Sequence, residues 1–372
     1  MNTEKKRRGV RPFGRKGMEG PTRLSTRAYL AVIVVLAAAL VFSLLAAITF
    51  GNADISIKEV YGVVAYELFH VERLSEFAQG PVHDVVWIIR FPRVLMGLAV
   101  GMGLSVCGVV MQAVVKNPLA DPYVLGVSSG ASLGATLAIL FGAGALFGRN
   151  FVGVMAFLGA VAVSFAVLFI SHAGGPSNAG KLILAGMAMS SVCSAFSSFA
   201  LYLAHNKDAL SEVMFWTMGS LASAKWSNVP VVLAIMTAGT ALFWTQFRNL
   251  NLMLLGDETS VTLGTDMHKV RGKYMILSSL MVGFAVYAAG TIGFVGLIIP
   301  HAVRMVFGAD HKRLIPLCAL IGGIFLIWAD VCCRVILRNS ELPIGILVSM
   351  IGAPCFIYLM IRHAYGFGGG QS

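Results

Sequence analysis

Long apolar runs separated by short polar stretches set the pattern of this chain. The clearest run extends from Val94 to Val115, and Gln112 is the only strongly polar side chain in its 22 residues. A helix rises about 1.5 Å per residue, so about 20 such residues are enough to cross the hydrocarbon core of a bilayer. Runs of comparable length recur to the end of the chain, and they predict a protein built from membrane-spanning helices.

The expected fold class is an all-α polytopic membrane protein with about ten transmembrane helices. The ten runs cover residues 28–50, 94–115, 124–147, 151–170, 182–203, 229–247, 274–289, 290–307, 314–329 and 342–361, the last interrupted by Pro354. They form one domain, residues 28–363, between a basic tail expected to be disordered, residues 1–27, and a short tail, residues 364–372. Between the first two runs, Ser56-Ile-Lys-Glu59 is a capping-box pattern, which predicts a short amphipathic helix at the membrane surface.

Composition and charge argue against a soluble enzyme and suggest an orientation. Of 372 residues, 57% are hydrophobic and 12% are charged, against about 25% charged in a typical soluble domain. The first 27 residues carry nine Lys or Arg and two Glu. Basic residues beside a first spanning helix keep that end in the cytoplasm, so no nucleic-acid partner is expected. With both termini in the cytoplasm, 18 Lys or Arg lie inside and nine outside, as expected for a bacterial cytoplasmic (inner) membrane protein.

Small residues in the third run predict a tight helix pair. Gly126, Gly130 and Gly134 recur every four residues and therefore share one helix face. Such stripes let helices approach closely in lipid, where packing rather than water exclusion drives their association.

Motifs for soluble catalytic chemistry are absent from the sequence. There is no G-x-x-x-x-G-K-[S/T], so any ATP must be bound by another chain, and there is no G-x-S-x-G or H-E-x-x-H. Six cysteines show no metal-ligand spacing, so neither a metal nor another cofactor is expected in this chain. A stripe of Met96, Met102 and Met111 could contact a haem or another chelate, but such stripes more often fill gaps in a core.

Four motifs along the chain carry a family resemblance. They are Arg90-Phe-Pro-Arg93, Asn117-Pro-Leu-Ala-Asp-Pro122 followed by Leu125 to Gly130, Leu255 to Gly264, and Gly290 to His301 with Arg304. In this order and spacing they closely resemble the FecCD-type permease subunits of ABC importers for iron-siderophores, haem and cobalamin. The resemblance covers about residues 28–363, which is all of the chain except its tails.

The resemblance implies a type II ABC importer permease fold with an inverted repeat. It implies a homodimer in the lipid bilayer, docked to two cytoplasmic ATP-binding subunits that hold the ATP and Mg. An extracytoplasmic substrate-binding protein would deliver the cargo. An iron(III) chelate, either a siderophore or haem, is the first expectation, and cobalamin is the alternative.

Three arginines match the family's positions for docking the binding protein: Arg90, Arg93 and Arg334. The expected topology places all three at the outer face. Two alternatives remain open, because arginines routinely anchor helix ends at a membrane interface. In addition, Asp330 lies four residues before Arg334 and could pair with it along one helix.

Two further groups of residues match cytoplasmic features of the family. The segment expected to couple to the ATPase contains Leu255, Gly256, Asp257, Glu258, Leu263 and Gly264. Its glycines would let the chain turn around a short helix, and its acids suit a first helical turn. The expected cytoplasmic gate contains Asn117, Leu119, Ser177 and Asn178, although a rigid turn bounded by prolines explains the first two equally well.

Two rival classes fit the sequence less well. A stand-alone secondary transporter usually carries carboxylates within its spans for ions or protons, and here the spans have none except Asp330 at an edge. An intramembrane enzyme would need a nucleophile beside a base, and the Gly126-Val-Ser-Ser-Gly130 run has no nearby histidine.

Overall fold

The computed structural model consists of helices and the turns and loops that connect them in the part of the chain that it describes, which is residues 25–51, 53–70, 72–173, 175, 178–255, 260, 267–337 and 340–362. Each of the ten predicted runs forms a helix. These are α1 (Thr26–Thr49), α4 (Phe91–Val115), α5 (Val127–Phe141), α6 (Phe151–Ala173), α7 (Ala179–Leu203), α9 (Val229–Thr245), α12 (Met267–Ala289), α13 (Val295–Phe307), α14 (His311–Val335) and α15 (Ile344–Arg362). Shorter helices are α2 (Ile57–Phe69), α3 (Pro81–His83), α8 (Lys207–Thr217) and α10 (Phe247–Leu255).

The helices have lengths suited to a membrane. Among the described residues, six are long and apolar enough to cross a bilayer alone, and α9 with α10 makes a seventh span if this bent pair is counted. Shorter apolar helices form from Val127–Phe141, Val295–Phe307 and Ile344–Tyr358. Together they account for the ten predicted runs, and α5 and α13, with 15 and 13 residues, are shorter than the about 20 residues that a regular helix needs to cross the hydrocarbon core.

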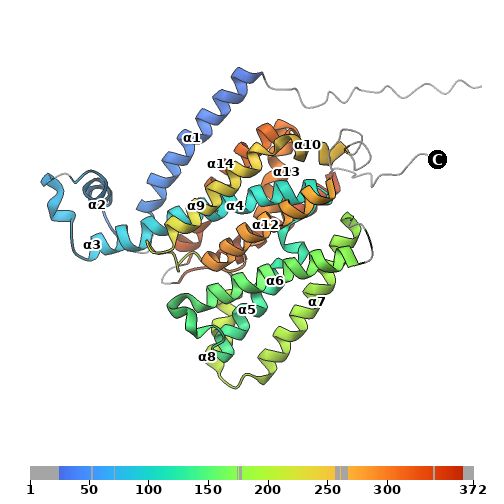
Figure 1. The fold of residues 1–372 in the computed structure, drawn as a ribbon. Helices are drawn as coiled ribbons and strands as arrows, with labels where there is room; N and C mark the ends of the chain where they lie inside the picture. Colours follow the sequence, from blue (N-terminus) through green and yellow to red (C-terminus); the bar gives the residue numbers. More distant parts are fainter. Residues whose placement is uncertain are drawn as a thin grey trace, which may run out of the picture.

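Helix α4 is the centre of the bundle. Almost all of its side chains are buried, and it contacts α9, α12, α13 and α14, which surround it in Figure 1. A second group, α5, α6 and α7, joins the first mainly through α6 and α12. Met96 and Met111 belong to the central core, which confirms that the methionine stripe fills space there. Helix α1 lies on the outside against α14.

The bundle has two ends. At the first, on the left of Figure 1, α1 ends, α4 begins and α14 ends; we call it the Arg93 end. At the second, α4 ends, α14 begins and α10 lies across the bundle; we call it the Asn251 end. Helices α2 and α3 extend beyond the bundle at the Arg93 end.

The expected capping box of α2 is confirmed. The Ser56 hydroxyl accepts a hydrogen bond from the Glu59 N–H at 3.3 Å, and the Ser56 N–H donates to Glu59 Oε2 at 2.9 Å. Hydrogen bonds from the side chain and the backbone of Ser56 lower the pKa of Glu59. The ionised carboxylate therefore holds the first turn of α2 together.

Two predictions about where the chain interrupts a helix were wrong. The run at 290–307 begins as helix only at Val295, because Gly290 (φ 66°) and Phe294 (φ 66°) adopt left-handed conformations that interrupt it. A Cβ on Gly290 would lie 2.5 Å from the Trp216 carbonyl oxygen, so a side chain does not fit there. Pro354, expected to interrupt the last run, instead lies inside the continuous helix α15, as membrane helices tolerate.

Two glycines of the predicted stripe, Gly130 and Gly134, bring α5 and α6 together, whereas Gly126 (φ 81°) lies in the turn before α5 begins and is not on its face. A Cβ on Gly130 would lie 2.5 Å from the Gly159 carbonyl oxygen, and a Cβ on Gly134 would lie 2.1 Å from that of Met155. Gly159 in turn faces Gly130 across the pair. The two backbones are therefore in direct contact, and neither can accept a side chain at these points.

Gly130→Ala is expected to destabilise the protein by about 1–3 kcal/mol, because overpacking at a backbone contact forces the helices apart. The matched control is Gly272→Ala on α12, where nothing lies within 4 Å of the added Cβ. The control should be neutral or slightly stabilising, since alanine favours helix over glycine. Thermal unfolding in detergent measures both, and equal unfolding temperatures for the two variants would contradict the contact.

Candidate functional site

The Arg93 end is held by a buried group of charges. Arg93 donates from Nε to Asp330 Oδ1 at 2.8 Å and from Nη1 to Glu341 Oε2 at 2.7 Å. Arg334 Nε lies 3.0 Å from the second oxygen of Asp330. The side chains of Arg93, Asp330 and Arg334 are all more than nine-tenths buried, whereas that of Glu341 is 42% exposed. One carboxylate therefore links α4 to α14.

Arg90 and Arg334 also hold the C-terminus of α1. Their guanidinium groups donate five hydrogen bonds of 2.6 to 3.2 Å to backbone carbonyls. The acceptors are the carbonyls of Ala47, Ile48, Thr49, Phe50 and Ala53. The last carbonyls of a helix lack partners within it and carry partial negative charge. The two arginines donate hydrogen bonds to these carbonyls and also place positive charge beside them.

The three arginines lie together at one end of the bundle, and all three are buried. Arg90, Arg93 and Arg334 are only 4%, 5% and 4% exposed. Their positive charge is used inside the protein, by a helix terminus and by the buried carboxylate of Asp330. The alternative pairing of Asp330 with Arg334 is confirmed. Docking of a binding protein by these residues stays a prediction.

Asp330→Asn is expected to destabilise the protein by about 3 kcal/mol, because it leaves two buried guanidinium groups without their carboxylate. Glu341→Gln is the matched control at the half-exposed edge of the same group, where an ion pair contributes less than about 1 kcal/mol. Thermal unfolding of the purified variants measures the difference. If Asp330→Asn unfolds at the wild-type temperature, the buried group does not hold the Arg93 end together.

A cavity of about 730 Å³ lies where α5, α13 and α15 begin. Hydroxyl groups line part of its wall, and the others are apolar groups and backbone. The hydroxyl-bearing residues are Tyr123, Ser128, Thr217, Thr291 and Ser349, and the large apolar ones are Met218, Phe294, Leu297, Ile346 and Met350. A neighbouring cavity of about 330 Å³ shares Ser128 and Thr291 with it. Its other lining residues are Ser129, Ser132, Ser194, Ser197 and Ser198.

Non-helical backbone forms part of the cavity wall. Ser220 N–H donates to the Ala289 carbonyl at 2.8 Å, and Ile344 N–H donates to the Gly219 carbonyl at 3.1 Å. Gly219 adopts a φ of 73°, and a Cβ there would lie 2.5 Å from the Thr291 carbonyl oxygen. The segments around Gly219, Ala289 and Ile344, far apart in the sequence, thus form hydrogen bonds between their backbone N–H and carbonyl groups. Irregular backbone at membrane depth requires this arrangement.

Two helix N-termini open at this cavity. Helix α13 follows Phe294, and α5 follows Gly126, and neither begins with a side-chain cap. The first N–H groups of a helix have no partner within it, and together they attract anionic groups. Asp121 also lines the cavity, and its burial raises its pKa to about 6. The site therefore combines polar N–H and hydroxyl groups with apolar surface.

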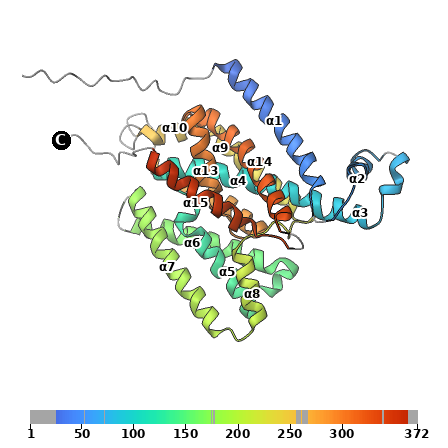
Figure 2. The same cartoon turned by 180° about the vertical axis from the view of Figure 1, so that it is seen from behind.

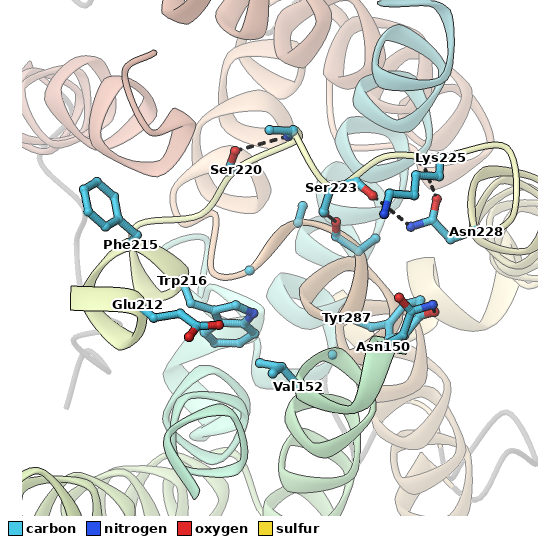
Figure 3. A pocket seen from close by; sticks show the side chains of 15 residues that line it. Asn150, Val152, Glu212, Phe215, Trp216, Ser220, Ser223, Lys225, Asn228 and Tyr287 are labelled. Atoms are coloured by element: carbon cyan, nitrogen blue, oxygen red, sulfur yellow. Dashed lines mark hydrogen bonds between the residues drawn. The ribbon is translucent and has the colours of Figure 1, made fainter. Parts of the chain in front are cut away.

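A separate cavity of about 450 Å³ lies between α8, the loop after it, and the ends of α6 and α12. Figure 3 shows Glu212 and Trp216 on one side and Lys225 and Asn228 across from them on the loop. The Asn228 amide fixes this loop, because its Oδ1 accepts from Lys225 N–H at 2.8 Å and its Nδ2 donates to the Ser223 carbonyl at 3.3 Å. This cavity belongs to the Arg93 end.

The predicted gate residues that the structure describes have local structural roles at the Asn251 end. Asn117 Oδ1 accepts a hydrogen bond from Leu119 N–H at 2.9 Å in the turn after α4. Asn178 caps α7 by accepting from Lys181 N–H at 2.8 Å. The alternative of a rigid turn therefore describes Asn117 and Leu119 well. A gating role for them and for Asn178 stays a prediction, and Ser177 lies outside the described residues.

The predicted coupling segment begins where α10 ends. Leu255 is the last residue of α10 and is 62% exposed. Leu254 beside it is 43% exposed, so the end of α10 presents two neighbouring apolar side chains that suit a contact with a partner. The other residues predicted for coupling, Gly256, Asp257, Glu258, Leu263 and Gly264, lie outside the described residues.

The residues that line the two cavities were not predicted from the sequence. Serines cluster in two of the apolar runs, at 128–132 and 190–198, and this clustering was a usable sign. Hydroxyl groups in a spanning helix often bond the carbonyl one turn earlier, so their presence alone does not identify a cavity. Which of them face a common space depends on how α5 and α7 pack.

Together, the spanning helices, the helices that begin inside the bundle and the cavity at their junction define a class of protein. It is a multi-pass membrane transport protein whose non-helical backbone lines the space between its helices. Residues 39–362 match the FecCD transport family, and the chain belongs to this family. This membership makes it a transport permease.

Several characterised relatives are similar along most of their length. The hemin transport system permease protein HmuU of Yersinia pestis is 38% identical over 281 residues, which cover 75% of this chain and 84% of the relative. The cobalamin import system permease protein BtuC of Halobacterium salinarum is 38% identical over 276 residues, which cover 74% of this chain and 73% of the relative.

A solved structure has the same fold. It is described as an inward-facing conformation of a protein assigned as a metal-chelate type ABC transporter. It matches with a TM-score of 0.75 and 30% identity, over 90% of this chain and 100% of that chain. The all-helical permease fold expected from the sequence is therefore confirmed.

Proposed function

We propose that this chain is the membrane-spanning permease subunit of an ATP-binding cassette importer. Its cargo is an iron(III) chelate, a siderophore or haem, delivered by an extracytoplasmic binding protein. The observation that carries this proposal is the cavity of about 730 Å³ at the junction of α5, α13 and α15. Its size falls within the range of about 300–1,000 Å³ typical of small-ligand sites.

The chemistry of the cavity favours a cargo with both anionic and apolar parts. The uncapped N-terminus of α5 suits a carboxylate group, whereas at the start of α13 the Phe294 backbone already bonds the Asp121 carboxylate. Phe294, Leu297 and Met350 offer apolar surface beside these two helix starts. Haem has two carboxylates on an apolar ring, which fits this combination. Cobalamin is the second candidate, because a cobalamin permease is as similar to this chain as a haem permease is.

The orientation follows from the charges at the two ends. The Asn251 end and both termini face the cytoplasm, and the Arg93 end faces outward. The excess of Lys and Arg in the connections assigned to the cytoplasm supports this orientation in a bacterial inner membrane. Exposed Leu254 and Leu255 at the end of α10 then lie on the cytoplasmic side, where an ATPase docks.

ATP hydrolysis belongs to a separate chain in this proposal. Two cytoplasmic ATP-binding subunits hold the ATP and Mg, and this chain needs no cofactor of its own. The rival of a gradient-driven transporter has less support, because Asp330 is the only carboxylate in the described apolar helices, and Asp121 lies in the turn after α4, where its Oδ1 accepts from the Tyr123 N–H at 2.8 Å. The Asp330 carboxylate is already held by two arginines, so it is not available to an ion.

A second copy of the chain completes the transport path. Ser191, Ser194 and Ser198 lie on the exposed face of α7, and hydroxyl groups gain little from facing lipid tails. Ser194 and Ser198 also line the smaller cavity, so this cavity reaches the exposed face. Helices α7 and α15 run along the side turned to the viewer in Figure 2. A homodimer formed on this side encloses the cavities between its two subunits.

The binding protein docks at the Arg93 end. Arg93 is itself buried, but the side chain of its ion-pair partner Glu341 is half exposed, so this ion pair reaches the solvent. An acidic group on the binding protein can join Arg93 there without dismantling the buried pair with Asp330. Arg90 and Arg334 support this surface by fixing the end of α1.

The composition of the purified complex tests the proposed function. The chain is co-expressed with its ATPase and binding protein, and native mass spectrometry measures the assembly and any ligand on the binding protein. The expected result is two copies of this chain with two ATPase chains, and an iron chelate on the binding protein. A monomer that retains no ATPase would contradict the proposal, and bound cobalamin would select the alternative cargo.

Ser128→Trp is expected to block uptake, because the indole enters the wall shared by both cavities. Assembly with the ATPase should persist, since Ser128 is not part of the packed core. Ser211→Trp on exposed α8 is the control, because its hydroxyl only bonds the Lys207 carbonyl of its own helix. Uptake into proteoliposomes measures both variants. Wild-type uptake by Ser128→Trp would place the path elsewhere.

A further inference from the structure

The elbow between α9 and α10 packs against the beginning of α14. The two helices meet at 58°, and α10 buries Leu250 and Met253 completely in the core. On the other side of this elbow, polar groups reach the first turn of α14. Two of its side chains, Trp244 and Asn251, make these contacts.

Asn251 bonds the N-terminus of α14 through both ends of its amide. Its Oδ1 accepts from the His311 N–H at 3.0 Å and lies 2.6 Å from His311 Nδ1. Its Nδ2 donates to Asp310 Oδ1 at 2.9 Å. The same Asp310 oxygen caps α14 by accepting from Lys312 N–H at 3.1 Å. The backbone N–H of His311 fixes which end of the amide is oxygen, and this places a proton on His311 Nδ1.

Trp244 satisfies a carbonyl that α14 itself leaves without a partner. Pro316 has no N–H, so the carbonyl of Lys312 four residues earlier loses its helical hydrogen bond. The indole N–H of Trp244 donates to that carbonyl at 3.0 Å. Proline and tryptophan therefore act together to join α9 to α14.

These contacts form one joint, which we call the elbow clamp: Trp244 and Asn251 on the elbow, with Asp310, His311 and Lys312 on α14. The far end of the same helix carries Asp330 and Arg334, which hold α4 and the end of α1. Helix α14 has 25 residues, which corresponds to about 37 Å. Polar contacts therefore fix α14 at both ends of the bundle.

We propose that the elbow clamp transmits movement from the ATPase to α14, and through α14 to the Arg93 end. This inference rests on the proposed function, because α10 leads directly into the predicted coupling residues. When the ATPase displaces α10, Asn251 and Trp244 carry the first turn of α14 with it. Asp330 and Arg334 then shift the ends of α4 and α1. Trp244 and Asn251 are thus positioning residues for transport.

Static packing and transmission predict different results. If the clamp only stabilises the fold, its loss lowers thermal stability but leaves the correctly assembled protein fully coupled. If the clamp transmits movement, its loss leaves the ATPase active but separates hydrolysis from transport. The number of substrate molecules moved per ATP hydrolysed distinguishes the two.

The experiment uses the complete transporter in proteoliposomes with the variants Trp244→Phe and Asn251→Ala. The first keeps an aromatic ring at a half-exposed position while removing the N–H donor, so it is expected to fold even if the second does not. Thr245→Ala is the matched control, because the neighbouring Thr245 hydroxyl donates to the Leu242 carbonyl and accepts from Gln246 Nε2, and neither partner lies on α14. Basal ATP hydrolysis, its stimulation by the binding protein, and uptake are measured with haemin and cyanocobalamin as parallel probes.

The clamp variants are expected to keep their basal hydrolysis and their KM for ATP. Stimulation by the binding protein and transport per ATP should both fall about tenfold, within the 5–150-fold range typical of coupling between sites. Thr245→Ala should behave as wild type. Full stimulation and full transport per ATP in Trp244→Phe would overturn the inference. If neither probe is taken up, the stimulation of hydrolysis alone decides.

Failure of the proposed function is distinguishable from failure of this inference. A wild-type protein that shows neither binding-protein stimulation nor ATP-dependent uptake of either probe refutes the importer itself. A wild-type protein that is coupled, together with clamp variants that remain coupled, refutes only the role of α14 as the transmitting helix.

Discussion

The carboxylate of Asp330 is the interaction on which the Arg93 end depends. Two guanidinium groups share it, and all three side chains are buried. Transfer of charges out of water is costly unless partners and further hydrogen bonds replace the lost hydration. Here the backbone carbonyls at the end of α1 and the carboxylate of Glu341 complete the set. The end of α1, the beginning of α4 and the end of α14 are therefore held as one unit.

A related constraint shapes the centre of the bundle. Backbone polar groups away from water must find partners within the protein, and the junction near Gly219, Thr291 and Gly345 provides them. Glycine is required at the closest point, because a Cβ on Gly345 would lie 2.3 Å from the Met218 carbonyl oxygen. This junction lets α13 and α15 begin inside the bundle, and the cavity occupies the space that remains. The cavity is thus a consequence of how the irregular backbone finds its hydrogen-bond partners.

Local patterns predicted the local structure well. Apolar runs located ten helices, Ser56 and Glu59 located the cap of α2, and glycines at 130 and 134 located the contact of α5 with α6. The four motifs identified the family. Each of these patterns predicts a helical run, a turn or a helix face, and each such feature is encoded within a few residues.

Long-range partners were not predictable in the same way. Arg93 and Asp330 are 237 positions apart, so no local pattern shows that the arginine is buried rather than exposed. The break at 290–294 depends on the Trp216 carbonyl, which the chain brings close only when it folds. The serines of the cavity and the bond from Trp244 to the Lys312 carbonyl likewise depend on packing. Features encoded by neighbouring residues were therefore predicted, and features that depend on residues far apart in the sequence were missed.

ATP-dependent uptake tests the central claim most directly. The chain is reconstituted into liposomes with its ATPase, the binding protein is added outside, and the time course of chelate entry is followed with ATP inside. The account predicts that entry requires ATP, the ATPase and the binding protein together, and that collapsing all ion gradients leaves it unchanged. Uptake that continues without ATP, or that stops when the gradients are collapsed, would contradict it.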